Sequence, residues 1–224
     1  MQTLQQLLVN KPFSTIISLP QNDFELARAA IEAGADALKF HINVSHFASG
    51  NHFEGIESYT QFIADVRAQF KGPIGVVLGD TIDKVAATDY ELLQRLSIQY
   101  YSLYSAHIDE RALSQQILEK TVAINYEFPL KQLPFFEQFK MTALELSIIK
   151  QSEYGQLLNL DDMLRYQSIR KQTNLPLIIP SQKKLTNANI KWLQSIGMNA
   201  VMLGAICIGQ TADSIYESIT QLMR

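Results

Sequence analysis

The chain has 224 residues, of which 47% are hydrophobic and 18% charged, so it can bury the core of one large domain. Its formal net charge is -3 and its lysines and arginines are scattered, which argues against the concentrated basic surface of a nucleic-acid-binding protein. A single cysteine, Cys207, excludes an internal disulfide framework, and no apolar run approaches the roughly 18 residues that a membrane span requires.

The first five residues contain neither the basic segment nor the long apolar segment of a secretory signal. We therefore expect a cytoplasmic protein without a membrane or nucleic-acid partner, folded as a single domain over residues 1–224. The composition leaves the oligomeric state open, a homo-oligomer included.

A short amphipathic helix opens the chain, and β-like runs then alternate with amphipathic, helix-like stretches. The apolar face of the opening helix carries Leu4, Leu7 and Leu8. We expect strands at residues 14–19, 37–44, 74–78, 100–104, 121–126, 143–149, 177–180 and 200–203. The helical patterns lie at residues 24–33, 59–70, 90–96, 108–118, 133–139, 161–172, 187–196 and 215–223.

Eight β-like runs at about 28 residues per unit predict an α/β protein with the (β/α)₈ architecture, a TIM barrel with a short N-terminal helix. The alternative is an open, doubly wound sheet. Neither a G-x-G-x-x-G nor a G-x-x-x-x-G-K-[ST] loop follows the first strand, and this favours the closed barrel.

The second expected strand, residues 37–44, alternates apolar and polar side chains. Alternate residues of a strand share a face, and the apolar face of a barrel strand packs on the outer helices. The polar residues Lys39, His41 and Asn43 are therefore expected to point into the barrel. His41 can serve in proton transfer or be a hydrogen-bonded core histidine, and these two interpretations are evenly balanced.

The same alternation sends Glu145 and Ser147 of the sixth strand inward, and Asn125 and Glu127 of the fifth strand toward the same mouth. A charged side chain inside a barrel is costly without a partner, so we expect Lys39 to pair with Glu145. The pair is either a catalytic or substrate-anchoring site or a structural ion pair, and the first interpretation is favoured. A Schiff base on the lysine is a less favoured third.

A loop rich in aromatic residues and histidines follows the second strand. Its His46 and His52 can form a metal site with His41, but their spacing matches no zinc signature, so we predict no metal. The favoured interpretation is a segment that covers the substrate, with Phe47 excluding water. Asp80, directly after the third strand, is a candidate ligand for a substrate hydroxyl or a turn residue.

The loops after the seventh and eighth strands are the usual phosphate site of this fold. Gly204 lets the backbone approach an anion, and the start of a further helix offers N–H donors. The alternative is that Gly204 only permits a tight turn. The expected phosphate ligands are Ser181, Gln182, Lys183, Gly204 and Ala205.

Residues 196–205 resemble the last strand of the ribulose-phosphate-binding group of TIM barrels, which contains sugar-phosphate epimerases, small decarboxylases and isomerases. The resemblance implies a small phosphorylated substrate bound near Gly204. The pentose-phosphate epimerases of that group carry a serine on the first strand, here Ser18, and a histidine on the second, here His41. The chain departs from them at Asn43 and Ser181, where they place acidic residues, and it lacks a third-strand histidine.

We therefore predict an enzyme that acts on a small phosphorylated metabolite by proton transfer next to a carbonyl, as an isomerase, epimerase or carbon-carbon lyase. Lys39, His41 and Glu145 are the predicted catalytic residues, and no cofactor is expected. Two alternatives remain open, namely a non-catalytic barrel that binds a phosphorylated ligand and a flavin-binding oxidoreductase.

Overall fold

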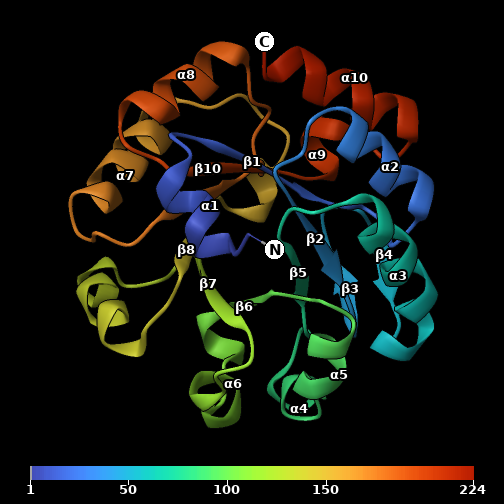
Figure 1. Ribbon diagram of the computed structural model, residues 1–224. Coiled ribbons are helices and arrows are strands. Elements are labelled where there is room, and N and C mark those ends of the chain that lie inside the picture. The colour runs from blue at the N-terminus through green and yellow to red at the C-terminus, as the bar shows by residue number, and fades with distance from the viewer. Residues whose placement is uncertain (1) are drawn as a thin grey trace.

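Eight parallel strands close into a barrel in the computed structural model, which describes residues 2–224 (Figure 1). Around the barrel the order is β1-β10-β9-β8-β7-β6-β5-β2. The predicted (β/α)₈ fold is thus confirmed, with a strand in each of the eight expected places. The barrel strands are β1 (Ser14–Ser18), β2 (Ala37–His41), β5 (Ile74–Val77), β6 (Tyr100–Tyr104), β7 (Glu119–Asn125), β8 (Ala143–Ser147), β9 (Leu177–Pro180) and β10 (Ala200–Leu203).

Helices surround this barrel, and most begin where a threonine, aspartate or asparagine side chain accepts a hydrogen bond from the first turn. None of the helices in residues 2–224 is long and apolar enough to cross a bilayer. The α-helices are α1 (Leu4–Asn10), α2 (Phe24–Glu32), α3 (Thr60–Gln69), α4 (Ile82–Ala86), α5 (Tyr90–Arg95), α6 (Glu110–Ser114), α7 (Leu160–Arg170), α8 (Asn187–Ser195), α9 (Ala205–Ile208) and α10 (Ala212–Leu222). The 3-10 segments are η1 (Ile56–Tyr59), η2 (Ser105–His107), η3 (Leu130–Phe139) and η4 (Gln151–Glu153).

Two of the expected helices differ from the structure. The pattern at 133–139 forms the 3-10 segment η3, which contains Pro134, a residue that cannot donate a backbone hydrogen bond. The pattern at 108–118 forms only the short α6. There the Gln115 side chain accepts hydrogen bonds from the backbone N–H groups of Ile117 and Leu118. These two N–H groups are therefore hydrogen-bonded without a continuation of the helix.

Helix α1 covers one end of the barrel and lies across its middle in Figure 1. Its Leu4, Leu7 and Leu8 are buried against inward-facing residues of several strands, including Tyr100 of β6. Glu119, at the start of β7, fixes the beginning of α1, because its carboxylate accepts hydrogen bonds from the N–H groups of Leu4 (2.7 Å) and Gln5 (3.0 Å). The polar interior is therefore closed at this end.

The side chain of Tyr100 fills the barrel interior at the end that α1 covers, beside Gly75. The Tyr100 ring is 1% exposed, and its hydroxyl donates to the Leu38 carbonyl over 3.0 Å. Gly75 of β5 pairs with Tyr100 in the sheet, and a Cβ atom at position 75 would lie 2.1 Å from the ring. Glycine is thus required here by space, since the ring occupies the volume of a side chain.

The second expected strand ends earlier than the sequence pattern indicated. β2 stops at His41, because Asn43 adopts a left-handed conformation (φ 54°) that turns the chain. The following residues form an antiparallel hairpin of β3 (Val44–His46) and β4 (Asn51–Phe53), with Gly50 at φ 72° in its turn. The loop expected to cover the mouth is therefore an ordered hairpin.

Candidate active site

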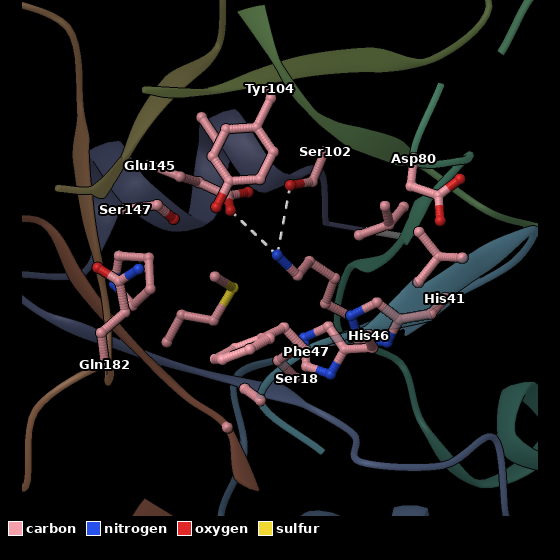
Figure 2. Close-up of a pocket in the computed structure, with 18 of the residues that line it drawn as sticks. Ser18, His41, His46, Phe47, Asp80, Ser102, Tyr104, Glu145, Ser147 and Gln182 are labelled. Atoms are coloured by element: carbon pink, nitrogen blue, oxygen red, sulfur yellow. Dashed lines mark hydrogen bonds and ion pairs between the residues drawn. The ribbon is translucent and has the colours of Figure 1, made fainter. Parts of the chain in front are cut away.

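A cavity of about 250 Å³ opens at the carboxyl ends of the strands, and all eight barrel strands contribute to its wall (Figure 2). The hairpin residues His46 and Phe47 form part of the wall, as do Gln151 and Tyr154 from the loop after β8. This is the end of the barrel opposite α1, and it is the end at which TIM barrels carry their reactive groups.

The floor of the cavity holds a buried ion pair. The Nζ atom of Lys39 lies 3.0 Å from Oε2 of Glu145, and the two residues are 6% and 2% exposed. Lys39 also donates to Ser102 Oγ (3.3 Å), and the Thr121 hydroxyl donates to Oε1 of Glu145 (2.8 Å), as Figure 2 shows for the lysine. Both charges are thus held in fixed positions at the base of the site, facing its open volume.

His41 and His46 pack against each other beside the lysine. Their ring centroids are 4.4 Å apart, and the His41 ring also packs against Phe53 in a tilted arrangement with ring centroids 4.8 Å apart. Burial lowers the pKa of His41 well below its usual value, and burial with the nearby Lys39 charge lowers the pKa of His46 to about 4. Both rings are therefore neutral at pH 7. The buried Nδ1 atom of His41 has no hydrogen-bond partner among residues 2–224.

The two histidines should make the protein less stable in mild acid. Between pH 6.5 and about 4 the unfolded chain binds protons at both positions and the folded chain does not, so the free energy of unfolding falls as the pH falls. Each histidine adds at most about 1.4 kcal/mol per pH unit to this slope. We expect the urea midpoint to drop from pH 7 to pH 5, and to drop less in His46→Gln. The exposed His52 provides the matched control variant, and an unchanged slope in His46→Gln would contradict the assignment.

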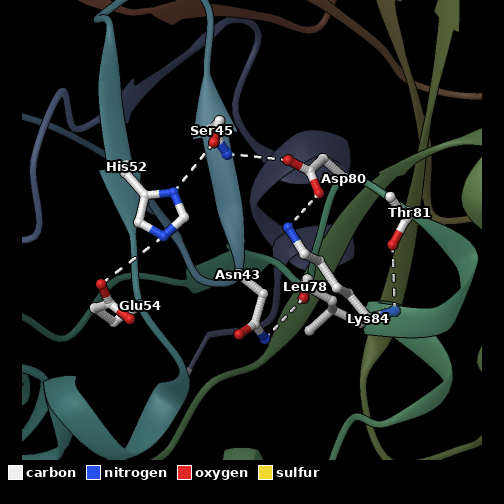
Figure 3. Close-up of polar contacts among 8 residues, drawn as sticks. All are labelled: Asn43, Ser45, His52, Glu54, Leu78, Asp80, Thr81 and Lys84. Atoms are coloured by element: carbon white, nitrogen blue, oxygen red, sulfur yellow. Dashed lines mark hydrogen bonds and ion pairs between the residues drawn. The ribbon is translucent and has the colours of Figure 1, made fainter.

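Asp80 fastens the hairpin to the end of β5 (Figure 3). Its carboxylate accepts from the Ser45 N–H (3.0 Å) and pairs with Lys84 (2.7 Å). Partial burial opposes ionisation, but the Lys84 and Ser45 hydrogen bonds hold the pKa of Asp80 below its usual value. Asn43 donates to the Leu78 carbonyl over 3.3 Å in the same network and does not line the cavity. These two residues position the hairpin, and only Asp80 also reaches the cavity wall.

The loops after β9 and β10 form one side of the mouth. Ser181, Gln182, Gly204 and Ala205 all line the cavity. The Gly204 N–H donates to Ser181 Oγ (2.9 Å), so this donor is already used within the protein. On this side of the mouth, the first residues of α9, which directly follow Gly204, also line the cavity.

Three residues expected at the mouth lie elsewhere. Lys183 is 2% exposed and turns outward from the cavity wall, where its Nζ pairs with Glu153 (3.0 Å) and Asp162 (3.4 Å). Asn125 and Glu127 follow the last inward position of β7 and are exposed outside the cavity. The difference arises because β7 ends at Asn125, where the strand alternation no longer fixes side-chain direction.

Ser18 and Ser147 both line the cavity. Tyr104 also lines it, although the sequence did not single this residue out. The hydroxyl of Tyr104 points toward the Glu145 end of the site in Figure 2. Burial raises the pKa of Tyr104, so it is a protonated donor at neutral pH. The alternation of Tyr100, Ser102 and Tyr104 along β6 is the signal that would have found it.

The tip of the hairpin covers part of the mouth. Phe47, at the tip of the hairpin, meets Tyr154 edge to face with ring centroids 5.7 Å apart, so the hairpin reaches across to the loop after β8.

His52 lies apart from the other two histidines, near Ser45 and Glu54. Within residues 2–224, no group of three or more histidine, cysteine, aspartate or glutamate side chains is placed to hold a metal ion.

The barrel is similar to two kinds of solved structure from Pyrococcus furiosus. A mutant tryptophan synthase alpha-subunit matches with a TM-score of 0.72 and 12% identity, over 94% of this chain and 97% of that chain. A thiamine phosphate pyrophosphorylase matches with a TM-score of 0.66 and 9% identity, over 96% of this chain and 95% of that chain. The likeness is one of fold. It agrees with the TIM-barrel fold predicted from the sequence. No family model and no curated protein matches the sequence.

Proposed function

We propose that the protein is an enzyme that transfers a proton at a carbon next to a carbonyl group in a small phosphorylated metabolite. Isomerisation and epimerisation begin in this way. Carbon-carbon cleavage next to a carbonyl instead produces the same kind of enolate by breaking the carbon-carbon bond, and the proton is then transferred to that carbon. The observation that carries the proposal is the Lys39–Glu145 pair at the cavity floor, since it places an acid and a base side by side where a substrate would reach them.

The chemistry follows from the charges around the floor. Removing a proton next to a carbonyl leaves negative charge on the carbonyl oxygen, and a fixed ammonium such as that of Lys39 stabilises this charge. Two groups beside it can accept the proton: the Glu145 carboxylate, and the neutral His41 ring, which also lines the cavity. The Tyr104 hydroxyl, which points toward the Glu145 end of the site, can donate a hydrogen bond to a second substrate oxygen.

The phosphate group of the substrate would lie against Ser181, Gln182, Gly204 and Ala205. These residues follow β9 and β10, the position where TIM barrels most often bind phosphate. Lys183 does not contribute directly in this arrangement, because Glu153 and Asp162 hold its ammonium. The similar solved structures support this proposal only through their fold, although one of them is by name an enzyme of thiamine phosphate.

Hydrogen exchange with solvent tests the proposal without knowledge of the product. The protein is incubated in D₂O with a panel of three- to six-carbon aldose and ketose phosphates and with their unphosphorylated counterparts. We expect at least one phosphorylated compound to lose its NMR signal at the carbon next to the carbonyl. Absence of exchange in every compound, with the protein shown to be folded, would remove the proposed reaction.

Gly204→Ala supplies the phosphate arm of this experiment. The backbone of Gly204 (φ -127°) accepts any residue, and an added Cβ would lie 3.9 Å from Ser18, an ordinary contact. The fold should therefore be unaffected, while the methyl group lies beside the proposed phosphate position. We expect about tenfold weaker apparent affinity for the phosphorylated compound, equivalent to about 1.4 kcal/mol. Equal affinity would place the phosphate elsewhere.

A further inference from the structure

A second hollow, of about 450 Å³, lies at the end of the barrel that α1 covers, far from the mouth. Its wall is made by residues at or just before the starts of β6, β7 and β8, together with the C-terminal end of α5 and the chain between α6 and β7. The residues that bear on the argument are Ser97, Glu119, Lys120, Lys140 and Thr142.

Lys120 in this wall differs from the other buried lysines. Three lysines of the described chain are buried, namely Lys39, Lys120 and Lys183. Lys39 and Lys183 each have a carboxylate oxygen at 3.0 Å. Lys120, which is 7% exposed, forms no ion pair within residues 2–224, and its one hydrogen bond goes to the Leu113 carbonyl at 2.8 Å.

A second cation lies close by. Lys140, which ends η3 in a left-handed conformation (φ 53°), is exposed and also has no ion-pair partner in the described chain. Burial and the Lys140 charge together lower the pKa of Lys120. The nearby Glu119 carboxylate accepts from α1 and forms no ion pair with either lysine in the described residues.

From this arrangement we infer that the hollow binds a small multivalent oxyanion, such as a phosphate or a tricarboxylate, between Lys120 and Lys140. A buried ammonium is costly without a counter-ion, and an anion between two cations compensates both. The hydroxyls of Ser97 and Thr142 in the same wall can donate to the remaining oxygens. This site is separate from the cavity at the mouth and does not depend on the proposed reaction.

Equilibrium dialysis with radiolabelled inorganic phosphate at low ionic strength tests the inference by stoichiometry. If the mouth also binds phosphate, the unmodified protein should bind two ions, Gly204→Ala two ions of which one binds about tenfold more weakly, and Lys120→Met/Lys140→Asn one. If the mouth site is absent, the first two proteins should each bind one ion and the lysine variant none. The second pattern would retain this inference while contradicting the phosphate part of the proposed function.

The controls separate a site from a general effect of charge. Lys71→Ala/Lys191→Ala removes two exposed lysines elsewhere and should keep the stoichiometry of the unmodified protein. Lys140→Asn alone suits the left-handed backbone, leaves the buried lysine in place and should weaken the site three- to tenfold. Thermal unfolding identifies any variant that fails to fold. Unchanged stoichiometry and affinity in both Lys140→Asn and the double variant would overturn the inference. Repeating the dialysis with citrate shows whether a tricarboxylate or a phosphate is preferred.

Discussion

Glu145→Gln is expected to lower the rate of solvent hydrogen exchange by roughly 10²- to 10⁴-fold, the usual effect of removing a general acid or base. Glutamine keeps the shape of the side chain and can still accept the Thr121 hydrogen bond. It leaves the Lys39 ammonium buried without its counter-ion, so the free energy of unfolding should also fall, by about 3 to 5 kcal/mol. Lys39→Met should likewise lower both the exchange rate and the free energy of unfolding, because it leaves the Glu145 carboxylate buried without its counter-ion.

The double variant Lys39→Met/Glu145→Gln separates catalysis from structure. Removing both charges eliminates the unpaired charge, so stability should recover in large part, whereas exchange activity should remain lost. Urea unfolding and NMR-detected exchange are measured on the same preparations. A double variant that keeps its exchange activity would show that the pair is only structural and that another group of the cavity, such as His41, transfers the proton. Bound flavin in the purified protein would instead favour the oxidoreductase alternative.

Gly75→Ala is expected to be the most destabilising single methyl addition in the barrel. The new Cβ would lie 2.1 Å from the ring of Tyr100, which is buried and fixed by its hydrogen bond to Leu38. Overpacking of this kind costs about 1 to 3 kcal/mol when neighbours can shift, and this ring has little room to do so. We expect a loss of at least about 3 kcal/mol in urea unfolding, or insoluble protein.

Two comparisons show whether the ring is the cause of that loss. Gly204→Ala adds the same methyl group at a position where its nearest neighbour lies at 3.9 Å, and it should leave the unfolding midpoint unchanged. The double variant Gly75→Ala/Tyr100→Leu provides space for the methyl group and should recover soluble, cooperatively unfolding protein. Failure of the second change to restore any stability would mean that the backbone at position 75 requires glycine for another reason.

Local alternation of side chains predicted the barrel and its charged floor. In a strand, neighbouring residues face opposite ways whatever the rest of the chain does, so the patterns around Lys39 and Glu145 were sufficient to direct both inward. Eight strand ends converge on one mouth in this fold, which is why two residues 106 positions apart in sequence could be expected to meet.

Positions beyond the strands were decided by contacts that sequence does not reveal. Lys183 faces Glu153 and Asp162 because the loop after β8 and helix α7 supply carboxylates on that side. The turn at Asn43 that starts the hairpin depends on a single left-handed residue within an otherwise regular pattern. The short α6 likewise results from side-chain bonds of Gln115, which an amphipathic pattern does not report.

The α1 segment also has implications for the order in which the molecule assembles. Its leucines rest on residues from strands throughout the chain, as late as Ala200, and its first turn is anchored by a glutamate more than a hundred positions downstream. Because α1 precedes all of these strands in the chain, its binding surface is incomplete until the last strand has been synthesised. The apolar face of α1 therefore stays exposed, or bound by a chaperone, until then, and α1 packs onto the barrel in one of the final steps of folding.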